Sequence, residues 1–256
     1  MMSVSKAKLY DENSVFQFRQ GVILMTEHLR PKEGNRILDL GCGTGRLAAQ
    51  LALKVGAQGQ VVAVDPNVGR IQVASSNVQP HHKNIKCFVG TVFDAVKLGP
   101  YDGIFCNFVL HWVPDESIAE TMHCVLDCLK PGKTMCAHIG VHPGPLFADL
   151  ERLLTGKASP GTPGRNPGQS SQYWKRLCES VGFDVTVAHQ EEYVQLQDGL
   201  DSCIAMVRAF AQVSEEECGI TDEEISQVMK VNNITARTDK IGVEMVYVRL
   251  IVKKPP

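Results

Sequence analysis

Three closely spaced glycines and two aspartates are the first residues in this sequence that could do chemistry together. Gly41, Gly43 and Gly45 lie in LDLGCGTGRLAA, which follows a predicted strand and opens a predicted helix. In that arrangement backbone N–H groups and a helix N-terminus can face a ligand. Asp39 ends the strand, where a carboxylate disfavours a pyrophosphate and favours a ligand ammonium. Asp65 ends the next strand, twenty residues after Gly45, where an acidic side chain can bind a ribose diol.

The spacing of these glycines distinguishes the turn from a dinucleotide-binding turn. The dinucleotide pattern is G-x-G-x-x-G, whereas this turn reads G-x-G-x-G and has Arg46 in the last position. The spacing and Asp39 together disfavour a dehydrogenase. Cys42 stands inside the turn, where we expect its backbone to matter more than its sulfur. Pro66 follows Asp65 at the same strand end.

A second candidate group lies in FVLHWVPDES, residues 108–117, where an apolar run ends in His111 and Trp112. Both residues come just after the carboxyl end of the fourth predicted strand, and ligands bind outside such strand ends in open α/β sheets. The structural alternative is that Trp112 packs under the next helix while His111 caps it. Asn107, in the same strand end, either packs or turns its amide toward a ligand.

The elements that must position these residues alternate regularly along the chain. Short β-rich runs predict strands, and amphipathic stretches between them predict helices. The predicted strands are 36–40, 61–65, 85–90, 101–109 and 133–141, and the predicted helices are 46–55, 68–77 and 116–129, with Asp115 placed to cap the last. A further amphipathic helix is predicted before the first strand, at 15–29. This alternation predicts βαβ units and a mostly parallel sheet covered on both faces.

After residue 141 the pattern changes. GKASPGTPGRNPG, residues 156–168, holds four glycines and three prolines and is predicted to be either a linker or a mobile lid. Helices are predicted at 170–181, 200–211 and 222–231, and strands at 183–195 and 243–255. We therefore expect one α/β domain with a seven-stranded Rossmann-like sheet and a helical insertion before the last strand. Its parts are an N-terminal helical cap (1–30), a cofactor-binding core (31–141), a Gly/Pro-rich loop and helix (142–182), a helical insertion (198–240) and a final strand (241–256).

The composition excludes several classes of function. Lys and Arg total 26 against 28 Asp and Glu, which leaves no electrostatic footprint for nucleic acid or an anionic membrane. No run approaches the ~18 apolar residues of a membrane span, and the start has no signal-peptide pattern. The nine cysteines stand singly, and Cys124-x-x-x-Cys128 and the His81–His82 pair lack the further ligands of a zinc site. We predict a metal-free cytoplasmic protein, monomeric or homodimeric.

ILDLGCGTG, the strand end at Asp65, LHWVPD and LKPG resemble the class I S-adenosylmethionine-dependent methyltransferases, in order and separation, across about residues 30–145. The resemblance implies a seven-stranded sheet whose last strand is antiparallel, in a hairpin of the final two strands. It implies S-adenosylmethionine as cofactor, with the methionine end at Asp39 and the glycine turn, the ribose at Asp65, and the adenine near 90–92 and Phe108. The implied cofactor-binding set is Asp39, Gly41, Cys42, Gly43, Gly45, Asp65, Pro66, Gly90, Thr91, Val92, Asn107 and Phe108. The sequence departs from the family at Thr91, where Asp is frequent, and at Lys133, where LKPGG is usual.

Within this class the sequence is similar to the small-molecule carboxyl methyltransferases of the juvenile hormone acid and trans-aconitate types. LHWVPD and the opening LYDENSVFQ, which resembles an L-Y-x-x-x-x-x-x-Q pattern, carry this similarity. It implies that Gln17 and Trp112 lie at the pocket of the methyl acceptor. Tyr10 either closes over the methionine carboxylate or packs locally. Arg208, a lone charge in an apolar helix, either reaches outward to solvent, which we favour, or meets an acceptor carboxylate.

A carboxylate acceptor needs no general base, so Gln17, His111 and Trp112 would only desolvate and orient it. We therefore predict methyl ester formation on a small-molecule acid. Two alternatives remain at this point. A phenol or amine acceptor would use His111 as a base. The second alternative is a partner subunit that binds the cofactor and has the fold but no activity, because fold alone does not imply activity.

Overall fold

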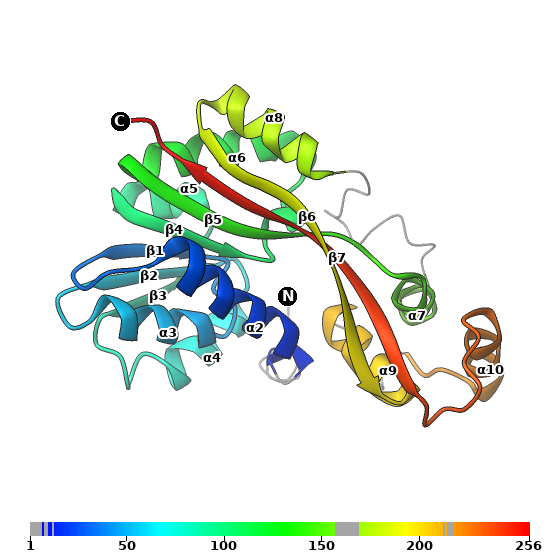
Figure 1. The fold of residues 1–256 in the computed structure, drawn as a ribbon. Helices are drawn as coiled ribbons and strands as arrows, with labels where there is room; N and C mark the ends of the chain where they lie inside the picture. The colour runs from blue at the N-terminus through cyan, green and yellow to red at the C-terminus, as the bar shows by residue number, and fades with distance from the viewer. Residues whose placement is uncertain (1–6, 8–9, 12, 157–168, 212, 214–217) are drawn as a thin grey trace.

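The computed structural model describes residues 7, 10–11, 13–156, 169–211, 213 and 218–256. Within these residues the chain builds a seven-stranded sheet in the order β3-β2-β1-β4-β5-β7-β6, in which β7 is antiparallel to both of its neighbours (Figure 1). This confirms the predicted architecture. The strands are β1 (Arg36–Leu40), β2 (Gln60–Asp65), β3 (Ile85–Val89), β4 (Tyr101–Asn107), β5 (Leu129–Pro143), β6 (Asp184–Asp198) and β7 (Lys240–Lys253).

Helices cover both faces of the sheet because alternate strand residues are apolar on each side. In β1, Leu38 packs with the helices of one face, whereas Ile37 packs with those of the other. The first face carries α5 (Val92–Ala95), α6 (Asp115–Cys128) and α8 (Ser171–Val181). The second carries the π-helix η1 (Leu24–Leu29), α3 (Arg46–Val55) and α4 (Val68–Asn77), with α2 (Val15–Ile23) leading into η1. The sheet is therefore the middle layer of three.

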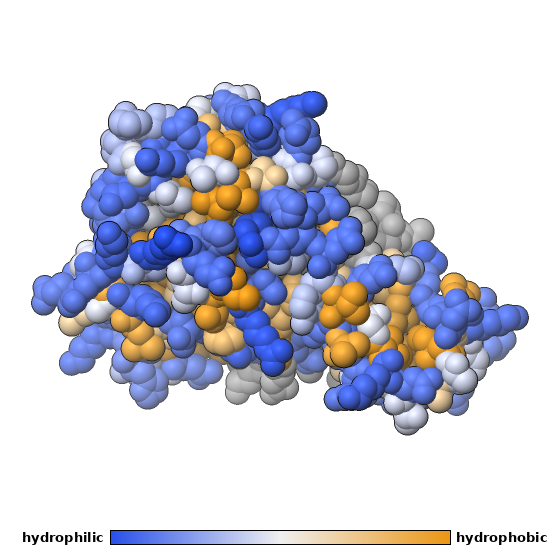
Figure 2. All heavy atoms as spheres, in the orientation of Figure 1, coloured by the Kyte–Doolittle hydropathy of each residue, from blue (hydrophilic) through white to orange (hydrophobic). Residues whose placement is uncertain are grey.

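Beyond the sheet, β6 and β7 continue as a long antiparallel hairpin paired from Asp184 to Asp198. Its outer half packs against α7 (Pro145–Thr155), α9 (Leu200–Ala211) and α10 (Asp222–Val231), which form a second apolar cluster (Figure 1). The face in Figure 2 is mostly hydrophilic, and one of its several hydrophobic patches lies over this outer half of the hairpin. The insertion thus has its own core, carried by the extended hairpin.

Local sequence patterns located most elements, and tertiary packing changed others. The bounds of α3, α4, α9 and α10 agree with the predicted ranges. The leading helix changes to π geometry at Leu24, and α7 was not predicted. Asp115 was expected to cap α6, but Pro114 is the N-cap residue and Asp115 accepts a hydrogen bond from Gln169 at 3.0 Å. Gly156 caps α7 with φ 62°, and the rest of the Gly/Pro-rich stretch, 157–168, lies outside the described residues.

Arg208 of α9 lies inside the insertion and does not reach outward. It is only 7% exposed, within a helix whose neighbours belong to the second apolar cluster. The prediction that this side chain extends to solvent was therefore wrong. None of the helices in the described part of the chain is long and apolar enough to cross a membrane.

Candidate active site

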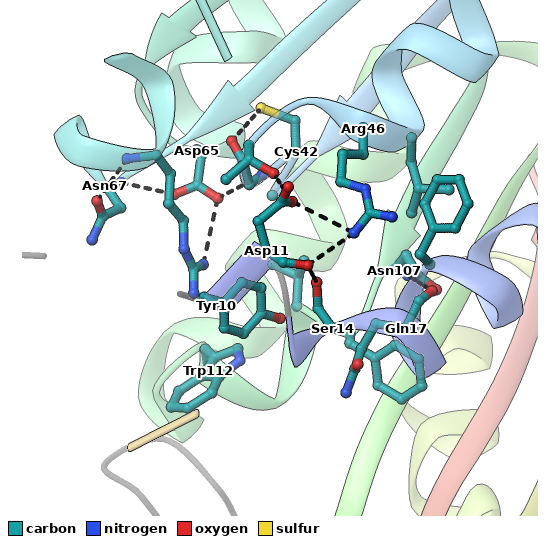
Figure 3. Close-up of a pocket in the computed structure, with 18 of the residues that line it drawn as sticks. Tyr10, Asp11, Ser14, Gln17, Cys42, Arg46, Asp65, Asn67, Asn107 and Trp112 are labelled. Atoms are coloured by element: carbon teal, nitrogen blue, oxygen red, sulfur yellow. Dashed lines mark hydrogen bonds and ion pairs between the residues drawn. The ribbon is translucent and has the colours of Figure 1, made fainter. Parts of the chain in front are cut away.

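A pocket of about 250 Å³ opens at the carboxyl ends of β1 and β4 (Figure 3). After these two neighbouring strands the chain continues toward opposite edges of the sheet. It runs from β1 through α3 to β2, and from β4 through α6 to β5. Ligands of open α/β sheets bind at such a point of divergence. Nine of the predicted site residues line the pocket: Gln17, Gly41, Cys42, Gly43, Asp65, Pro66, Asn107, Phe108 and Trp112.

The glycine turn forms the floor of this pocket, and each glycine has a left-handed φ, between 57° and 85°. A Cβ on Gly41 would lie 2.2 Å from a methyl of Val109, so this position requires glycine for packing. A Cβ on Gly43, in contrast, would meet no atom within 4 Å. Gly43 is therefore where a ligand can approach the backbone closely. Gly45 is the N-cap of α3 and does not line the pocket.

Asp65 links this turn to the start of α4. One carboxylate oxygen accepts the backbone N–H of Gly43 at 3.0 Å, and the other accepts that of Asn67 at 2.8 Å. The Arg70 guanidinium lies 3.7 Å from the same carboxylate and stacks over the ring of Tyr10 at 4.5 Å. A carboxylate has about four acceptor positions, so Asp65 can still accept hydrogen bonds from a ligand in the pocket.

Asp39 lies below the turn and does not line the pocket. Only 2% of its surface is exposed, and Oδ2 has no hydrogen-bond partner among the described residues. Burial, followed by the nearby charge of Asp65, raises the pKa of Asp39 to about 8. The sequence predicted this carboxylate at a ligand ammonium, whereas in the structure it is buried and lies outside the lining of the pocket.

A different carboxylate enters the pocket, from a segment that we call the N-terminal strap (Tyr10, Asp11 and residues 13–17). Thr44 donates its hydroxyl hydrogen bond to the Asp11 carboxylate. Arg46 donates to the Asp11 carbonyl at 2.9 Å and pairs with its carboxylate at 3.8 Å (Figure 3). The Arg46 guanidinium also lies over the ring of Phe18, at 4.4 Å. The strap is thus fastened to the glycine turn, with both charges of the pair at the pocket wall.

At the end of β4 the chain bends sharply into the pocket. Phe108 has φ 57°, a left-handed conformation that is strained for a bulky residue, and its N–H donates to the His138 carbonyl at 2.8 Å. Asn107 lines the pocket, but its amide serves the protein. Its Nδ2 donates to the Gln17 carbonyl at 2.9 Å, and its Oδ1 lies 3.1 Å from Nδ1 of His138. The protein thus holds this amide in place, and its contact with the cofactor stays a prediction.

A small annex of about 30 Å³ adjoins the pocket and shares four of its lining residues, Tyr10, Gln17, Phe108 and Trp112. Its remaining wall is mainly apolar and includes Val141, Phe210, Met245 and Val246, together with His111, Gly140 and Tyr247. Gln17 is buried, and its Oε1 has no hydrogen-bond partner among the described residues. The annex is therefore an apolar space with a few polar groups at its edge.

His111 lies in the annex wall with a defined orientation. Its Nδ1 accepts the backbone N–H of Gly140 at 3.1 Å, and its ring lies 5.2 Å from that of Trp112. A neutral imidazole whose Nδ1 accepts a hydrogen bond carries its proton on Nε2. His111 can thus donate from Nε2, whereas its basic nitrogen is already occupied by Gly140.

Of the four predicted adenine-site residues, Phe108 lines the pocket, whereas Gly90, Thr91 and Val92 follow the strand next to Asp65 and do not. Gly90 donates its N–H to the Asp65 carbonyl at 3.1 Å. Thr91 forms a capping box with Asp94 at the start of α5, and Val92 is buried in the core. Their contact with adenine stays a prediction. Asp11, Thr44, Arg46, Asn67 and Arg70 line the pocket without having been predicted. For Asp11 the reason is that no local sequence pattern brings the strap to the turn.

Comparisons with known proteins agree with this geometry. Residues 37–132 match the family model described as a methyltransferase domain. The malonyl-[acyl-carrier protein] O-methyltransferase of Halalkalibacterium halodurans is 26% identical over 77% of this chain and 73% of its own. The ubiquinone biosynthesis O-methyltransferase of Methylocella silvestris is 36% identical, over 42% of this chain and 41% of its own.

Among solved structures, the YcgJ protein of Bacillus subtilis superimposes with a TM-score of 0.65. The match covers 93% of this chain and 99% of that protein, at 15% identity, and so supports the fold. The strand order, the glycine turn at the divergence of β1 and β4, and the matched family model lead to one assignment. Residues 37–132 are those of a methyltransferase domain, and the chain around them has the fold of the class I S-adenosylmethionine-dependent methyltransferases.

Proposed function

We propose that the protein transfers a methyl group from S-adenosylmethionine to the carboxylate of a small acid, forming a methyl ester. The observation that carries this proposal is the hydrogen bond from Gly140 to Nδ1 of His111. Because Nδ1 is occupied, His111 offers the annex a donor and no free basic nitrogen. A carboxylate needs donors and an apolar wall, whereas a phenol or amine acceptor would need a base. Similarity to the malonyl-[acyl-carrier protein] O-methyltransferase agrees with an acid acceptor.

Three features of the pocket support this cofactor. Gly43 leaves open space beside a backbone that lines the pocket, and Asp65 keeps acceptor positions that suit ribose hydroxyls. The Asp11–Arg46 pair presents a carboxylate and a guanidinium side by side. This arrangement complements an α-amino acid, because the carboxylate attracts an ammonium and the planar guanidinium binds a carboxylate. We assign the methionine end to this pair, in place of the buried Asp39.

When bound, S-adenosylmethionine supplies a methyl group made electrophilic by the adjacent sulfonium. The residues of this chain supply position and exclude water. Gln17, His111 and the Trp112 indole N–H are donors at the edge of the annex, while Phe108 and Phe210 limit hydration of the acceptor. Holding two reacting groups in line can lower a barrier by roughly 7–11 kcal/mol. No proton transfer is required of any of these side chains.

The test is a methylation screen analysed by mass spectrometry. The protein is incubated with S-adenosylmethionine and, in separate reactions, with lipophilic monocarboxylic acids, small di- and tricarboxylic acids, phenols and primary amines. We expect base-labile methyl esters from at least one acid. Methylation of phenols or amines alone would contradict the proposal and reassign His111 as a base. Binding of S-adenosylhomocysteine without any transfer would favour a partner subunit that lacks activity.

A further inference from the structure

A row of polar side chains crosses the middle of the sheet behind the pocket. Asn107 of β4 is in register with His138 of β5, and His138 is in register with Arg249 of β7. The His138 ring is completely buried. Its Nδ1 lies 3.1 Å from Oδ1 of Asn107, and its Nε2 lies 3.4 Å from Nε of Arg249. Arg249 in turn pairs with Glu191 of β6 at 2.9 Å. Polar groups of four neighbouring strands are therefore connected.

Only one assignment of hydrogen-bond donors and acceptors is possible along this row. A guanidinium has no acceptor, so the contact between Arg249 and His138 requires Nε2 of His138 to accept. Neutral His138 then carries its proton on Nδ1 and donates to Oδ1 of Asn107. The Asn107 amide is thereby oriented with its NH₂ group toward the Gln17 carbonyl, 2.9 Å away. A flipped amide would place two oxygens against each other at that point.

The surroundings keep His138 in the neutral form that this assignment needs. Burial, then the charges of Arg249 and His28, lower the pKa of His138 to about 3. Glu191, the acidic partner of Arg249 in this row, also accepts a hydrogen bond from the Tyr247 hydroxyl at 2.7 Å. His138 is therefore neutral near pH 7, and its two hydrogen bonds keep the directions given above.

We propose that His138 is a positioning residue, which fixes α2 and its side chain Gln17 at the annex by orienting the amide of Asn107. The proposal rests on the proposed function only for the role of Gln17 at the acceptor. The hydrogen bond from Asn107 reaches α2 at the residue whose side chain lines both cavities. The Tyr247 hydroxyl, which donates to Glu191, also lies 3.1 Å from Oε1 of Gln20, so β7 is close to the same helix at a second point. Residues of the sheet thus hold the helix that carries Gln17 to the annex.

Hydrogen exchange of α2, measured by mass spectrometry on the full-length protein, tests the relay without any acceptor. His138→Leu removes both hydrogen bonds, and Asn107→Leu removes the link to Gln17. We expect each variant to speed exchange of peptides within residues 13–23 by about 10-fold, the effect of losing about one hydrogen bond, with β1 and β2 unchanged. The double variant should also show about 10-fold and not about 100-fold, because both changes break one chain of contacts.

Two matched variants separate positioning from packing. His138→Gln keeps a donor and an acceptor at the site and should restore most of the protection of α2. His189→Leu changes an exposed histidine that is in register with Arg249 from the other side, and it should leave exchange unchanged. The proposal is overturned if His138→Leu leaves α2 as protected as His189→Leu does, or if the two single effects multiply. If His138→Leu fails to fold, unchanged exchange of α2 in Asn107→Leu overturns it equally.

Discussion

The backbone N–H of Gly43 lies 3.0 Å from Oδ2 of Asp65, so the glycine turn after β1 is hydrogen-bonded to the carboxylate that ends β2. Two residues that line the pocket are therefore held together before any ligand binds. Such preorganisation reduces the ordering that binding would otherwise require. Asp65 therefore helps to fix the shape of the turn. In our proposal the same carboxylate also binds the ribose.

Asp65→Ala should weaken S-adenosylhomocysteine binding at least ~10-fold, because hydrogen bonds to a charged acceptor contribute about 1.5–3 kcal/mol. Isothermal titration calorimetry measures this loss. Asp127→Ala, at an exposed position of α6, is the matched control and should bind as the parent does. Equal affinities of the two variants would remove Asp65 from the cofactor site.

Gly41→Ala and Gly43→Ala should fail in different ways, although both glycines have positive φ. At Gly41 the new methyl would meet Val109 at 2.2 Å, so we expect a loss of several kcal/mol in the free energy of unfolding. At Gly43 the methyl meets no protein atom, and the left-handed conformation costs about 1 kcal/mol. Gly43→Ala should therefore stay folded and lose S-adenosylhomocysteine affinity. Urea unfolding and calorimetry distinguish the two outcomes.

Asp11→Asn and Arg46→Gln test the assignment of the amino-acid end of the cofactor. Each should weaken S-adenosylhomocysteine by about 10-fold, because each removes one charge-assisted contact. Neither should change the affinity of 5′-methylthioadenosine, which has the nucleoside but lacks the amino-acid group. If both ligands weaken in parallel, the pair only holds the strap in place. If neither weakens, the amino-acid end lies elsewhere.

The buried carboxyl of Asp39 should make stability depend on pH. Its pKa is raised from 3.8 to about 8 by burial and by Asp65. Between these values the folded state holds a proton that the unfolded state has lost, so the free energy of unfolding falls as pH rises through this window. Each unit of pKa displacement corresponds to about 1.4 kcal/mol, so a few kcal/mol are involved. Urea unfolding at pH 5, 7 and 9 should show this decline, and Asp39→Asn should flatten it relative to Asp127→Asn.

Trp112→Phe keeps much of the apolar surface and deletes the indole donor. We expect kcat/KM for an acid found in the screen to fall by roughly 10–150-fold, with S-adenosylhomocysteine affinity nearly unchanged.

His111→Gln should lower kcat/KM only slightly, since a glutamine oxygen can accept the hydrogen bond from Gly140. The rate of the parent should not rise across ~pH 6–7. A rate that climbs through this range in the parent and collapses in His111→Gln would instead identify His111 as a base.

The sequence by itself was sufficient for what depends on neighbours along the chain. Apolar spacing located α3, α4, α9 and α10, since an amphipathic pattern is a property of ten or twelve consecutive residues. The G-x-G-x-G turn and Asp65 predicted the pocket at the right strand ends, because parallel strands bring their carboxyl ends to one edge. His111 and Trp112 were placed beside it for the same reason.

Only the tertiary structure decided which polar groups line the pocket. Asp39 follows its strand to the correct end, yet the turn covers it, while Asp11 arrives from a segment with no local signal. Asn107 was expected to serve the cofactor, but its partners Gln17 and His138 lie 90 and 31 residues away. Arg208 is buried by helices of the insertion. Hydrogen bonds and burial are set by contacts between distant residues, and no spacing along the chain encodes them.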